Sequence, residues 1–441
     1  MAGSGESGAE CRPGLAASIW DRLPRLNALL GGTTTLGDCT VAIRYLVSPG
    51  HLVQGPAITE FERAFAQTIG VRFACSFCSG RVGLYGLLRG LGVGPGDEVL
   101  LQAPTHIVVA NAIRYTGARP VYVDCQLDTY NMDLEQAEQR ITPRTKVLLL
   151  QHSFGIPVDL DAALDLARRH KLEVIEDCVH ALGATYAGRP VGSFGRAAFF
   201  STEETKTIST TMGGMVVTDD PELAAQMQAF QENCAWPSAS LTARYILKLV
   251  MYHVQTQPYL HRYVRAVYKH VLRRRNPLPR ATTAAELRGL RPDNYEQRLS
   301  NAQAALGLRQ LRRLESNLAY RRTVASAYQA KLAGHGFRLP QPPARAEPAF
   351  VRYPVWVADR GATYRAAASH AVLGIWFSSV LEESASPEAG DYEMGSCPRA
   401  EVATKHLVNL PTHLRVKTRD IDAIVSAVVK AASLTENGEC E

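Results

Sequence analysis

Residues 145–178 read TKVLLLQHSFGIPVDLDAALDLARRHKLEVIEDC. An apolar run opens this stretch, residues 159–171 have the pattern of a helix, and a second apolar run closes it. Short apolar runs on either side of a helix are typical of parallel strands joined by a right-handed crossover. The stretch therefore predicts a strand, a helix and a strand of one parallel sheet.

The same alternation extends from about residue 53 to residue 218. Further strands are expected at 97–105 and 119–125, and further helices at 81–93 and 106–117. The fold class predicted is α/β, with a large, mostly parallel sheet covered by helices on both faces. Ligands bind at the carboxyl ends of strands in such sheets. This rule directs attention to four places: residues 104–106, Phe154, Asp177 and the strand before Lys206.

The second half of the chain predicts a smaller C-terminal α/β domain. We expect one long helix over residues 294–332, a proline-rich linker, and then a strand (VRYPVWVA), a helix, a strand (GIWFSS) and a terminal helix. The predicted organisation has four parts: an N-terminal leader or arm (1–40), a large domain (41–235), a basic helical insertion (236–293), and the long helix with the small domain (294–441).

The composition excludes several classes of protein. Of the 441 residues, 46% are hydrophobic and 20% are charged, the balance of a soluble globular protein. No run of 18 apolar residues predicts a transmembrane helix, and the N-terminus lacks a secretory signal pattern. Nine dispersed cysteines indicate reduced thiols and a cytoplasmic protein. The CxxC at 75–78 has no matching second pair, so no metal site is predicted.

Three features along the chain suggest a common chemistry. Asp177 ends an apolar strand, where a buried carboxylate requires a cationic partner such as a protonated pyridine nitrogen. Lys206 follows another buried strand, and a desolvated lysine becomes a nucleophile that can form a Schiff base. Ser79 and Gly80 precede a helix whose free N–H groups could bind a phosphate, and Ser201 could add a hydroxyl.

Together these features are typical of a pyridoxal phosphate site. Each of them alone has a simpler interpretation. Asp177 could cap a helix, Lys206 could be a solvated loop residue, and a Ser-Gly pair before a helix is commonplace. Their order on one α/β scaffold favours the cofactor site.

The chain resembles the DegT/DnrJ/StrS family of sugar aminotransferases, which are fold-type I pyridoxal phosphate enzymes. The matching segments run in the family's order over residues 55–414. They include GPAITEFERAFAQTIGV (55–71), LEVIEDCVHALGATYAGRPVGSFGRAAFFS (172–201), TKTISTTMGGMVVTDDPELA (205–224) and RLSNAQAALGLRQL (298–311).

The resemblance implies roles for individual residues. Lys206 would form the Schiff base, Asp177 would keep the pyridine nitrogen protonated, and His180 would contact the ring hydroxyl; these three are the predicted catalytic residues. His106 occupies the position of a ring-stacking side chain. The predicted phosphate ligands are Gly80, Arg81 and Ser201, together with Arg298, which would reach across a homodimer with a shared active site.

Two departures from the family pattern leave questions open. The family's SGT is SGR here, so either Arg81 or Arg298 could supply the charge for the phosphate. The family's SFYPTK is STEETK, which brings Glu203 and Glu204 near the lysine. We expect both carboxylates to face solvent.

The function that the resemblance implies is transfer of an amino group to a keto-sugar or cyclic ketone. The donor would be an amino acid such as glutamate, and the acceptor would be nucleotide-linked, in sugar, polysaccharide or natural-product biosynthesis. Members that replace the lysine with histidine carry out dehydration, so Lys206 favours transamination. The alternatives are other chemistry with the same cofactor, and a non-catalytic ligand-binding or regulatory protein on this scaffold.

The basic insertion stands apart in its charge. The net charge is +6, but residues 233–285 contain nine lysines or arginines and no acidic residue. A predicted helix places Leu260, Val264, Val267 and Val271 on one face and Arg262, Arg265, Lys269 and Arg273 on the other, and Arg274 and Arg275 follow.

Three interpretations of this helix are open. Its apolar face could pack on the core with the basic face in water. Residues 260–275 could instead attract a diphosphate-bearing substrate. They could also adsorb to an anionic membrane, which would place the protein at the inner face of that membrane. No motif indicates binding of nucleic acid.

Overall fold

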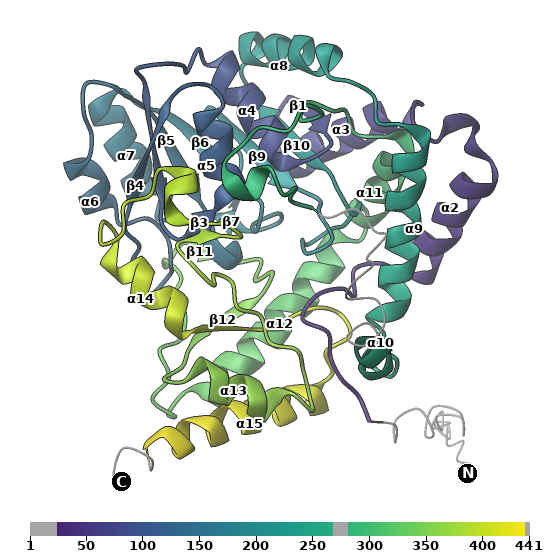
Figure 1. Cartoon of the computed structure of the whole chain (residues 1–441), viewed down its shortest axis with the longest axis vertical. Helices are drawn as coiled ribbons and strands as arrows, with labels where there is room; N and C mark the ends of the chain where they lie inside the picture. The colour runs from purple at the N-terminus through teal and green to yellow at the C-terminus, as the bar shows by residue number, and fades with distance from the viewer. Residues whose placement is uncertain (1–23, 268–280, 437–441) are drawn as a thin grey trace, which may run out of the picture.

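The computed structural model describes residues 24–267 and 281–436. A seven-stranded sheet forms the centre of the larger part of the molecule (Figure 1). Its strands, in spatial order, are β1 (Phe73–Phe77), β10 (Gly214–Thr218), β9 (Ala197–Ser201), β6 (Glu173–Asp177), β5 (Thr145–Gln151), β2 (Glu98–Gln102) and β4 (Arg119–Val123). The strands from β9 to β4 are parallel, and β10 runs antiparallel to both of its neighbours. The predicted α/β class with a mostly parallel sheet is confirmed.

Helices cover both faces of this sheet because its strands are apolar on both sides. Val147 and Leu149 of β5 belong to one buried cluster, and Leu148 and Leu150 belong to the other. The first cluster includes side chains from α4 (Gly80–Gly90), α5 (Ile107–Arg114) and α8 (Pro221–Asn233). The second includes side chains from α3 (Ala57–Ile69), α6 (Leu134–Gln139), α7 (Leu160–His170) and α11 (Asn301–Leu311).

The predicted strand–helix–strand unit forms as β5, α7 and β6. Asp159 caps α7 by accepting a hydrogen bond from the Ala162 N–H at 3.3 Å, and Lys171 ends the helix in the left-handed conformation. β6 then runs parallel to β5, with Asp177 as its last residue beside Gln151. The crossover thus places Asp177 at the carboxyl edge of the sheet.

The smaller part of the molecule lies at the C-terminal end of α12 (Leu314–Leu332), away from the seven-stranded sheet (Figure 1). It contains β12 (Tyr353–Trp356), α13 (Arg360–Ala367), β14 (Leu407–Leu410) and α15 (Thr418–Glu436), with an apolar cluster of its own. α14 (Pro398–His406) precedes β14.

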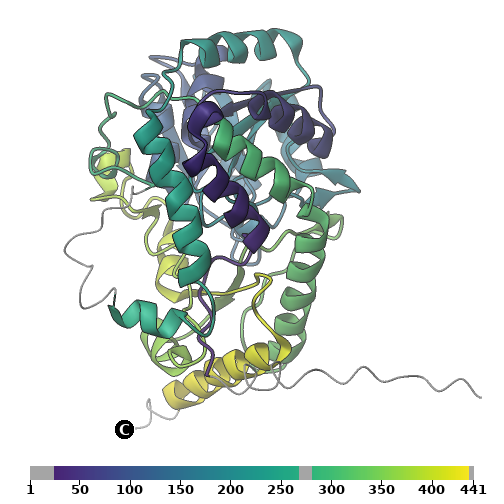
Figure 2. The same cartoon turned by 90° about the vertical axis from the view of Figure 1, so that its right-hand side faces the viewer.

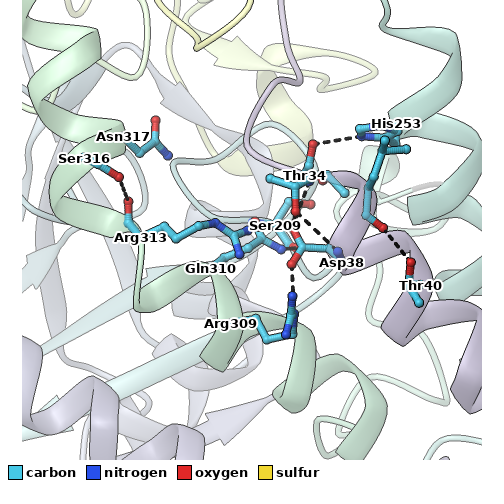
Figure 3. A network of polar contacts seen from close by, with 12 residues as sticks. Thr34, Asp38, Thr40, Ser209, His253, Arg309, Gln310, Arg313, Ser316 and Asn317 are labelled. Carbon is cyan, nitrogen blue, oxygen red and sulfur yellow. Dashed lines mark hydrogen bonds and ion pairs between the residues drawn. The ribbon is translucent and has the colours of Figure 1, made fainter.

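Two predictions about this half are wrong in detail. The single helix expected over 294–332 begins only at Asn301 and is broken into α11 and α12 at Arg313, whose φ of −110° and ψ of 8° leave the helical region. The guanidinium groups of Arg309, in α11, and of Arg313, at the break, bind the buried Asp38 of α2 (Leu36–Val47) (Figure 3).

The GIWFSS segment, residues 374–379, is also not a strand. The Trp376 N–H donates to the side chain of Asn409, and the Asn409 amide donates back to the Trp376 carbonyl. Gly374 and Asn409 form one isolated backbone bridge, and side-chain hydrogen bonds take the place of a strand ladder beyond it. The strand of this region is β13 (Leu381–Glu382), which pairs in parallel with β3 (Thr105–His106).

The predicted basic insertion begins with α9 (Ala239–Gln255), which packs beside α2 (Figure 2). α10 (His261–Val267) follows, and none of its residues is buried. Leu260 and Val267 are 45% and 55% exposed and Val264 is half-buried, so the described part of this apolar face does not pack in the core. Lys269, Val271, Arg273, Arg274 and Arg275 lie outside the described residues. Among the described helices, none is long and apolar enough to cross a membrane.

Candidate active site

A cavity of about 360 Å³ opens at the carboxyl ends of β6 and β9. The start of α4, the loop after β9 and residues 373–383 of the smaller part line it. Seven of the eight residues predicted to form the site line this cavity: Gly80, Arg81, His106, Asp177, His180, Ser201 and Lys206. The structure therefore brings together residues that are up to 126 positions apart in the sequence. Their roles toward a cofactor stay predictions.

Asp177 presents a buried carboxylate to the cavity. Only 1% of its surface is exposed, and its carboxylate accepts a hydrogen bond from the Val179 N–H at 3.1 Å. Burial raises the pKa of Asp177 to about 6, although the nearby Lys206 ammonium opposes this rise. A cationic ligand atom would stabilise this carboxylate.

Lys206 lies across the same cavity. Its Nζ sits 4.3 Å from the centre of the Trp376 ring. Burial lowers the pKa of Lys206 to about 8, and the positive charge of Arg352 adds to this effect while Glu203 and Asp177 oppose it. An amine with such a pKa is more often neutral at physiological pH than an ordinary lysine, and is thus a better nucleophile.

Amide side chains fix the loop that follows Lys206. Gln310 accepts a hydrogen bond from the Ser209 N–H at 2.9 Å and donates one to the Ser209 carbonyl at 2.5 Å. Gln303 and Asn317 donate to other carbonyls of the same loop at 2.6–3.1 Å. Figure 3 shows Gln310, Asn317 and Ser209 at the junction of α11 and α12. These helices therefore hold the lysine loop from behind.

The start of α4 suits an anionic group. Ser79 precedes the helix, and its side chain makes no capping bond, so the first N–H groups have no side-chain cap. A Cβ on Gly214 would lie 2.3 Å from the Gly80 nitrogen, and a Cβ on Gly80 would lie 2.9 Å from the Phe200 carbonyl oxygen. Glycine at both positions lets β9, β10 and the start of α4 meet closely, with Ser201 at the end of β9.

Arg81 is already paired within the protein. Its guanidinium lies 2.5 Å from the Glu286 carboxylate and also donates to the Ala281 carbonyl. Its charge is thus already compensated, and its predicted contact with a phosphate stays a prediction. The helix N-terminus at Gly80 and Arg81 remains available through its backbone.

Arg298 does not line the cavity. It donates to the carbonyls of Glu232 and Cys234 and lies over the ring of Trp236 at 4.5 Å. Within one chain it is therefore separate from the predicted site, and a role across a dimer stays a prediction.

His180 lies in a turn, stacked on Trp376 with ring centres 4.4 Å apart. Its Nδ1 is buried and has no hydrogen-bond partner in the described structure. Burial lowers the pKa of His180 well below the usual value, and Lys206 and Arg352 add to this effect, so the ring is neutral.

His106 caps α5 and borders the same cavity. Its Nδ1 accepts a hydrogen bond from the Val108 N–H at 3.3 Å, and its Nε2 lies 3.4 Å from the Glu383 carboxylate. The His106 contact lowers the pKa of Glu383 to about 2. Both ring nitrogens are thus engaged, which fixes the orientation of the ring.

The expectation that Glu203 and Glu204 face solvent is wrong. Glu203 lines the cavity and accepts a hydrogen bond from the Thr205 N–H at 2.9 Å. The Glu204 carboxylate lies 2.6 Å from the Lys248 Nζ on α9. The lysine loop is thus linked to the insertion as well as to the sheet.

The sequence analysis assigned no individual role to two charged or aromatic cavity residues, Arg352 and Trp376. Arg352 is 2% exposed, and its guanidinium carbon lies 3.5 Å from the centre of the Trp376 ring. A signal for Arg352 existed, because a charged residue interrupts the apolar segment VRYPVWVA. Nothing in the local sequence places it beside Lys206.

Three potential metal ligands lie close together at β6, although no metal site was predicted. Ligand atoms of His152, Glu176 and Cys178 lie within 4.8 Å of one another among the described residues. The protein already uses this carboxylate, because Glu176 accepts hydrogen bonds from His152 and from the backbone N–H groups of residues 192, 194 and 195.

The cavity fits pyridoxal phosphate by four observations. Asp177 offers a buried carboxylate for a protonated ring nitrogen, and Lys206 offers an amine with a lowered pKa. The unpartnered Nδ1 of His180 offers a polar atom for the ring hydroxyl, and the start of α4 offers N–H groups for a phosphate.

Comparison with known proteins agrees with this chemistry. The DegT/DnrJ/EryC1/StrS aminotransferase family matches residues 38–429. GDP-perosamine synthase of Caulobacter vibrioides is 34% identical over 379 residues, which cover 85% of this chain and 90% of that protein. UDP-4-amino-4-deoxy-L-arabinose–oxoglutarate aminotransferase of Shewanella sediminis is 38% identical over 187 residues, covering 42% and 48%.

A solved structure extends the similarity to the whole fold. DesV of S. venezuelae superposes with a TM-score of 0.72 at 29% identity, covering 93% of this chain and 99% of DesV. The predicted fold-type I architecture, cofactor and enzyme class are confirmed. The chain belongs to the DegT/DnrJ/EryC1/StrS aminotransferase family, and it is a pyridoxal phosphate-dependent aminotransferase.

Proposed function

We propose that this enzyme transfers the amino group of glutamate to a nucleotide-linked keto-sugar. The names of its relatives support both substrates, since one includes a GDP-sugar and the other includes a UDP-sugar and oxoglutarate. The observation that carries the proposal is that Lys206 and Asp177 line the same cavity, each with a pKa shifted by burial. Retention of the lysine favours amino transfer over dehydration.

Bound pyridoxal phosphate supplies an aldehyde that condenses with amines and a ring that accepts electrons. The pKa of Lys206 is lowered to about 8. Once an incoming amine has displaced Lys206 from the cofactor, its neutral Nζ would accept the proton from the donor's α-carbon. Asp177 holds the proton on the ring nitrogen, and His180 orients the ring hydroxyl. Trp376 and the neighbouring apolar side chains exclude water from the reacting atoms.

We also propose that the enzyme is a homodimer. α2 and α9 lie side by side, and each presents exposed apolar side chains on one face: Leu36, Ile43 and Val47 from α2, and Leu247, Met251 and Val254 from α9. Several exposed apolar side chains on two adjacent helices suggest a protein interface. In such a dimer Arg298 would reach the phosphate-binding site of the partner subunit.

The test is an absorption spectrum of the purified protein before and after addition of glutamate, with Lys206→Ala in parallel. We expect the visible band of the bound cofactor to be lost with glutamate and restored by a nucleotide-linked keto-sugar, in the wild-type protein only. A band that glutamate leaves unchanged would indicate another donor or other chemistry. A protein that binds cofactor but transfers no amine to any acceptor would indicate a ligand-binding role.

A further inference from the structure

The end of the basic insertion covers the start of α4. Two groups from residues 281–290, which we call the strap, bind the Arg81 guanidinium: the Glu286 carboxylate at 2.5 Å and the Ala281 carbonyl. Arg81 is the second residue of α4 and lines the cavity, whereas Glu286 is 3% exposed and lies outside the cavity lining. A nearly buried ion pair therefore fastens the strap to the helix end that suits a phosphate.

The strap is also held at points away from this ion pair. Asn111 of α5 donates a hydrogen bond to the Glu286 carbonyl at 2.8 Å, and side chains at the end of α5 donate to the carbonyls of residues 289 and 290. The Glu286 carboxylate itself accepts hydrogen bonds from the N–H and the hydroxyl of Thr283 at 2.8 and 2.9 Å. These bonds fix the carboxylate independently of Arg81, so Glu286 determines where the guanidinium lies.

The ion pair changes the charge that a phosphate meets at this end of the cavity. An anion bound by the free N–H groups of α4 is attracted by Arg81 and repelled by Glu286, and the two effects largely cancel because the charges are paired. A guanidinium can bind a phosphate with parallel hydrogen bonds, but donors of Arg81 are directed at the strap. A phosphate therefore gains little from this arginine while the pair is intact.

We propose that Glu286 is a positioning residue that holds the Arg81 side chain on the strap and thereby weakens binding of the cofactor's phosphate. The backbone N–H groups of α4 then bind the phosphate, and Arg81 anchors the strap. Loss of the Glu286 charge would leave a nearly buried guanidinium beside an anion that can pair with it. The effect concerns the phosphate alone, and it is independent of the identity of the amino donor and the acceptor.

The test measures the affinity of the cofactor-free protein for pyridoxal phosphate, by the visible band, and for inorganic phosphate, by calorimetry. We expect Glu286→Gln, which keeps the shape of the side chain, to bind both ligands roughly 10- to 100-fold more tightly than the wild type. The matched control is Asp391→Asn, which removes the carboxylate that pairs with Arg114 at 2.8 Å outside the cavity lining. It should leave both affinities unchanged.

A double variant shows whether the effect acts through Arg81. Glu286→Gln combined with Arg81→Gln removes both charges, so we expect its affinities to return to within about 3-fold of the wild type. A merely structural role for Glu286 predicts the opposite sign for the single variant, because a loosened strap would leave the phosphate site less well formed. Unchanged or weaker binding by folded Glu286→Gln would overturn the proposal. Tighter binding that persists in the double variant would also overturn it.

Melting temperatures show whether each variant is folded. If Glu286→Gln does not fold, Arg81→Gln takes its place, because it keeps the Glu286 charge without the arginine. It should then bind both ligands more weakly than the double variant, and equal affinities would overturn the proposal. Neither ligand requires a donor or an acceptor, so these affinities stand whether or not glutamate proves to be the donor.

Discussion

Asp177 and Lys206 face one cavity, and burial moves their pKa values toward each other, to about 6 and about 8. Each group is thus buried without full compensation of its charge in the empty protein, and a ligand could supply that compensation. The carboxylate is desolvated without a cation of its own, and the amine is desolvated beside the positive charge of Arg352. The cost of this arrangement is measurable as stability, and its benefit as reactivity.

The stability cost predicts that Asp177→Asn stabilises the cofactor-free protein. The folded-state pKa of about 6 lies above the ordinary 3.8, so the native state binds this proton more tightly than the unfolded state and loses stability as pH rises between these values. At pH 7.5 we expect Asn to raise the free energy of unfolding by about 2–3 kcal/mol, measured by urea denaturation. Below about pH 4 the gain should vanish.

Asp177→Asn should also lower the rate of amino transfer by at least about 100-fold, because it removes the carboxylate that would pair with the protonated ring nitrogen of the cofactor. A variant that is no more stable at pH 7.5, or that keeps full activity, would contradict this assignment of Asp177.

The benefit is predicted to appear in the pH dependence of Lys206. In the cofactor-free protein we expect capture of pyridoxal phosphate at Lys206, trapped by borohydride and located by mass spectrometry, to rise with a midpoint near pH 8. Arg352→Gln should move this midpoint upward, because loss of a neighbouring positive charge favours the protonated amine. A midpoint near that of an exposed lysine, unaffected by the variant, would disagree with the structure.

The sequence predicted individual residues well where local pattern and chain order coincide. Asp177 and Lys206 each follow an apolar strand, and parallel strands bring their carboxyl ends to one edge. Arg352 and Trp376 could not be predicted in this way. They come from a distant segment whose position over the sheet depends on packing of the smaller part, and residues 374–379 have no strand pattern in the structure.

At the scale of elements, the lysine loop depends on α11 and α12 more than on its own strand. Side chains of Gln303, Gln310 and Asn317 pair with its backbone from behind, so the break between the two helices lies where the loop is held. Apolar spacing predicted helix throughout this region. It could not show the break, which lies beside the tertiary ion pairs of Asp38 with Arg309 and Arg313.

We predict that Gln310→Ala loosens the lysine loop. The substitution leaves the buried N–H and carbonyl of Ser209 without partners, which should cost about 2–4 kcal/mol of stability and increase hydrogen exchange over residues 207–212. The control is Gln228→Ala on the exposed face of α8, which should change stability by less than about 0.5 kcal/mol. Equal effects of the two variants would show that Gln310 does not hold the loop.

At the scale of the whole molecule, the residues that line the cavity range from Leu29 to Glu383. Leu29 and Leu30 line it beside the smaller part, and the preceding Arg25 forms a nearly buried ion pair with Asp420 of α15. The start of the described chain is thus tied to its C-terminal helix. Residues 1–40 were predicted to be a leader or arm; α2 (Leu36–Val47) begins at the end of this range and is packed through its buried Asp38.

The exposed faces of α2 and α9 predict how the whole molecule assembles. Val47 is 73% exposed at the end of α2, and Val254 is 48% exposed on α9. If two copies associate through these faces, Val47→Glu together with Val254→Glu places desolvated charges in the interface, which a dimer cannot accommodate cheaply. Light scattering should then give the 48.1 kDa of one chain, against twice that mass for the wild type.

Val402→Glu is the matched control, because Val402 is 43% exposed on α14, away from α2 and α9. It should leave the mass unchanged. The monomeric variant also separates two uses of Arg298. If this residue reaches the partner's phosphate site, dissociation weakens cofactor binding and Arg298→Gln does the same in the intact dimer. If the monomer retains the cofactor with wild-type affinity, one chain's α4 N-terminus is sufficient for the phosphate, and Arg298 serves only the contact with Trp236.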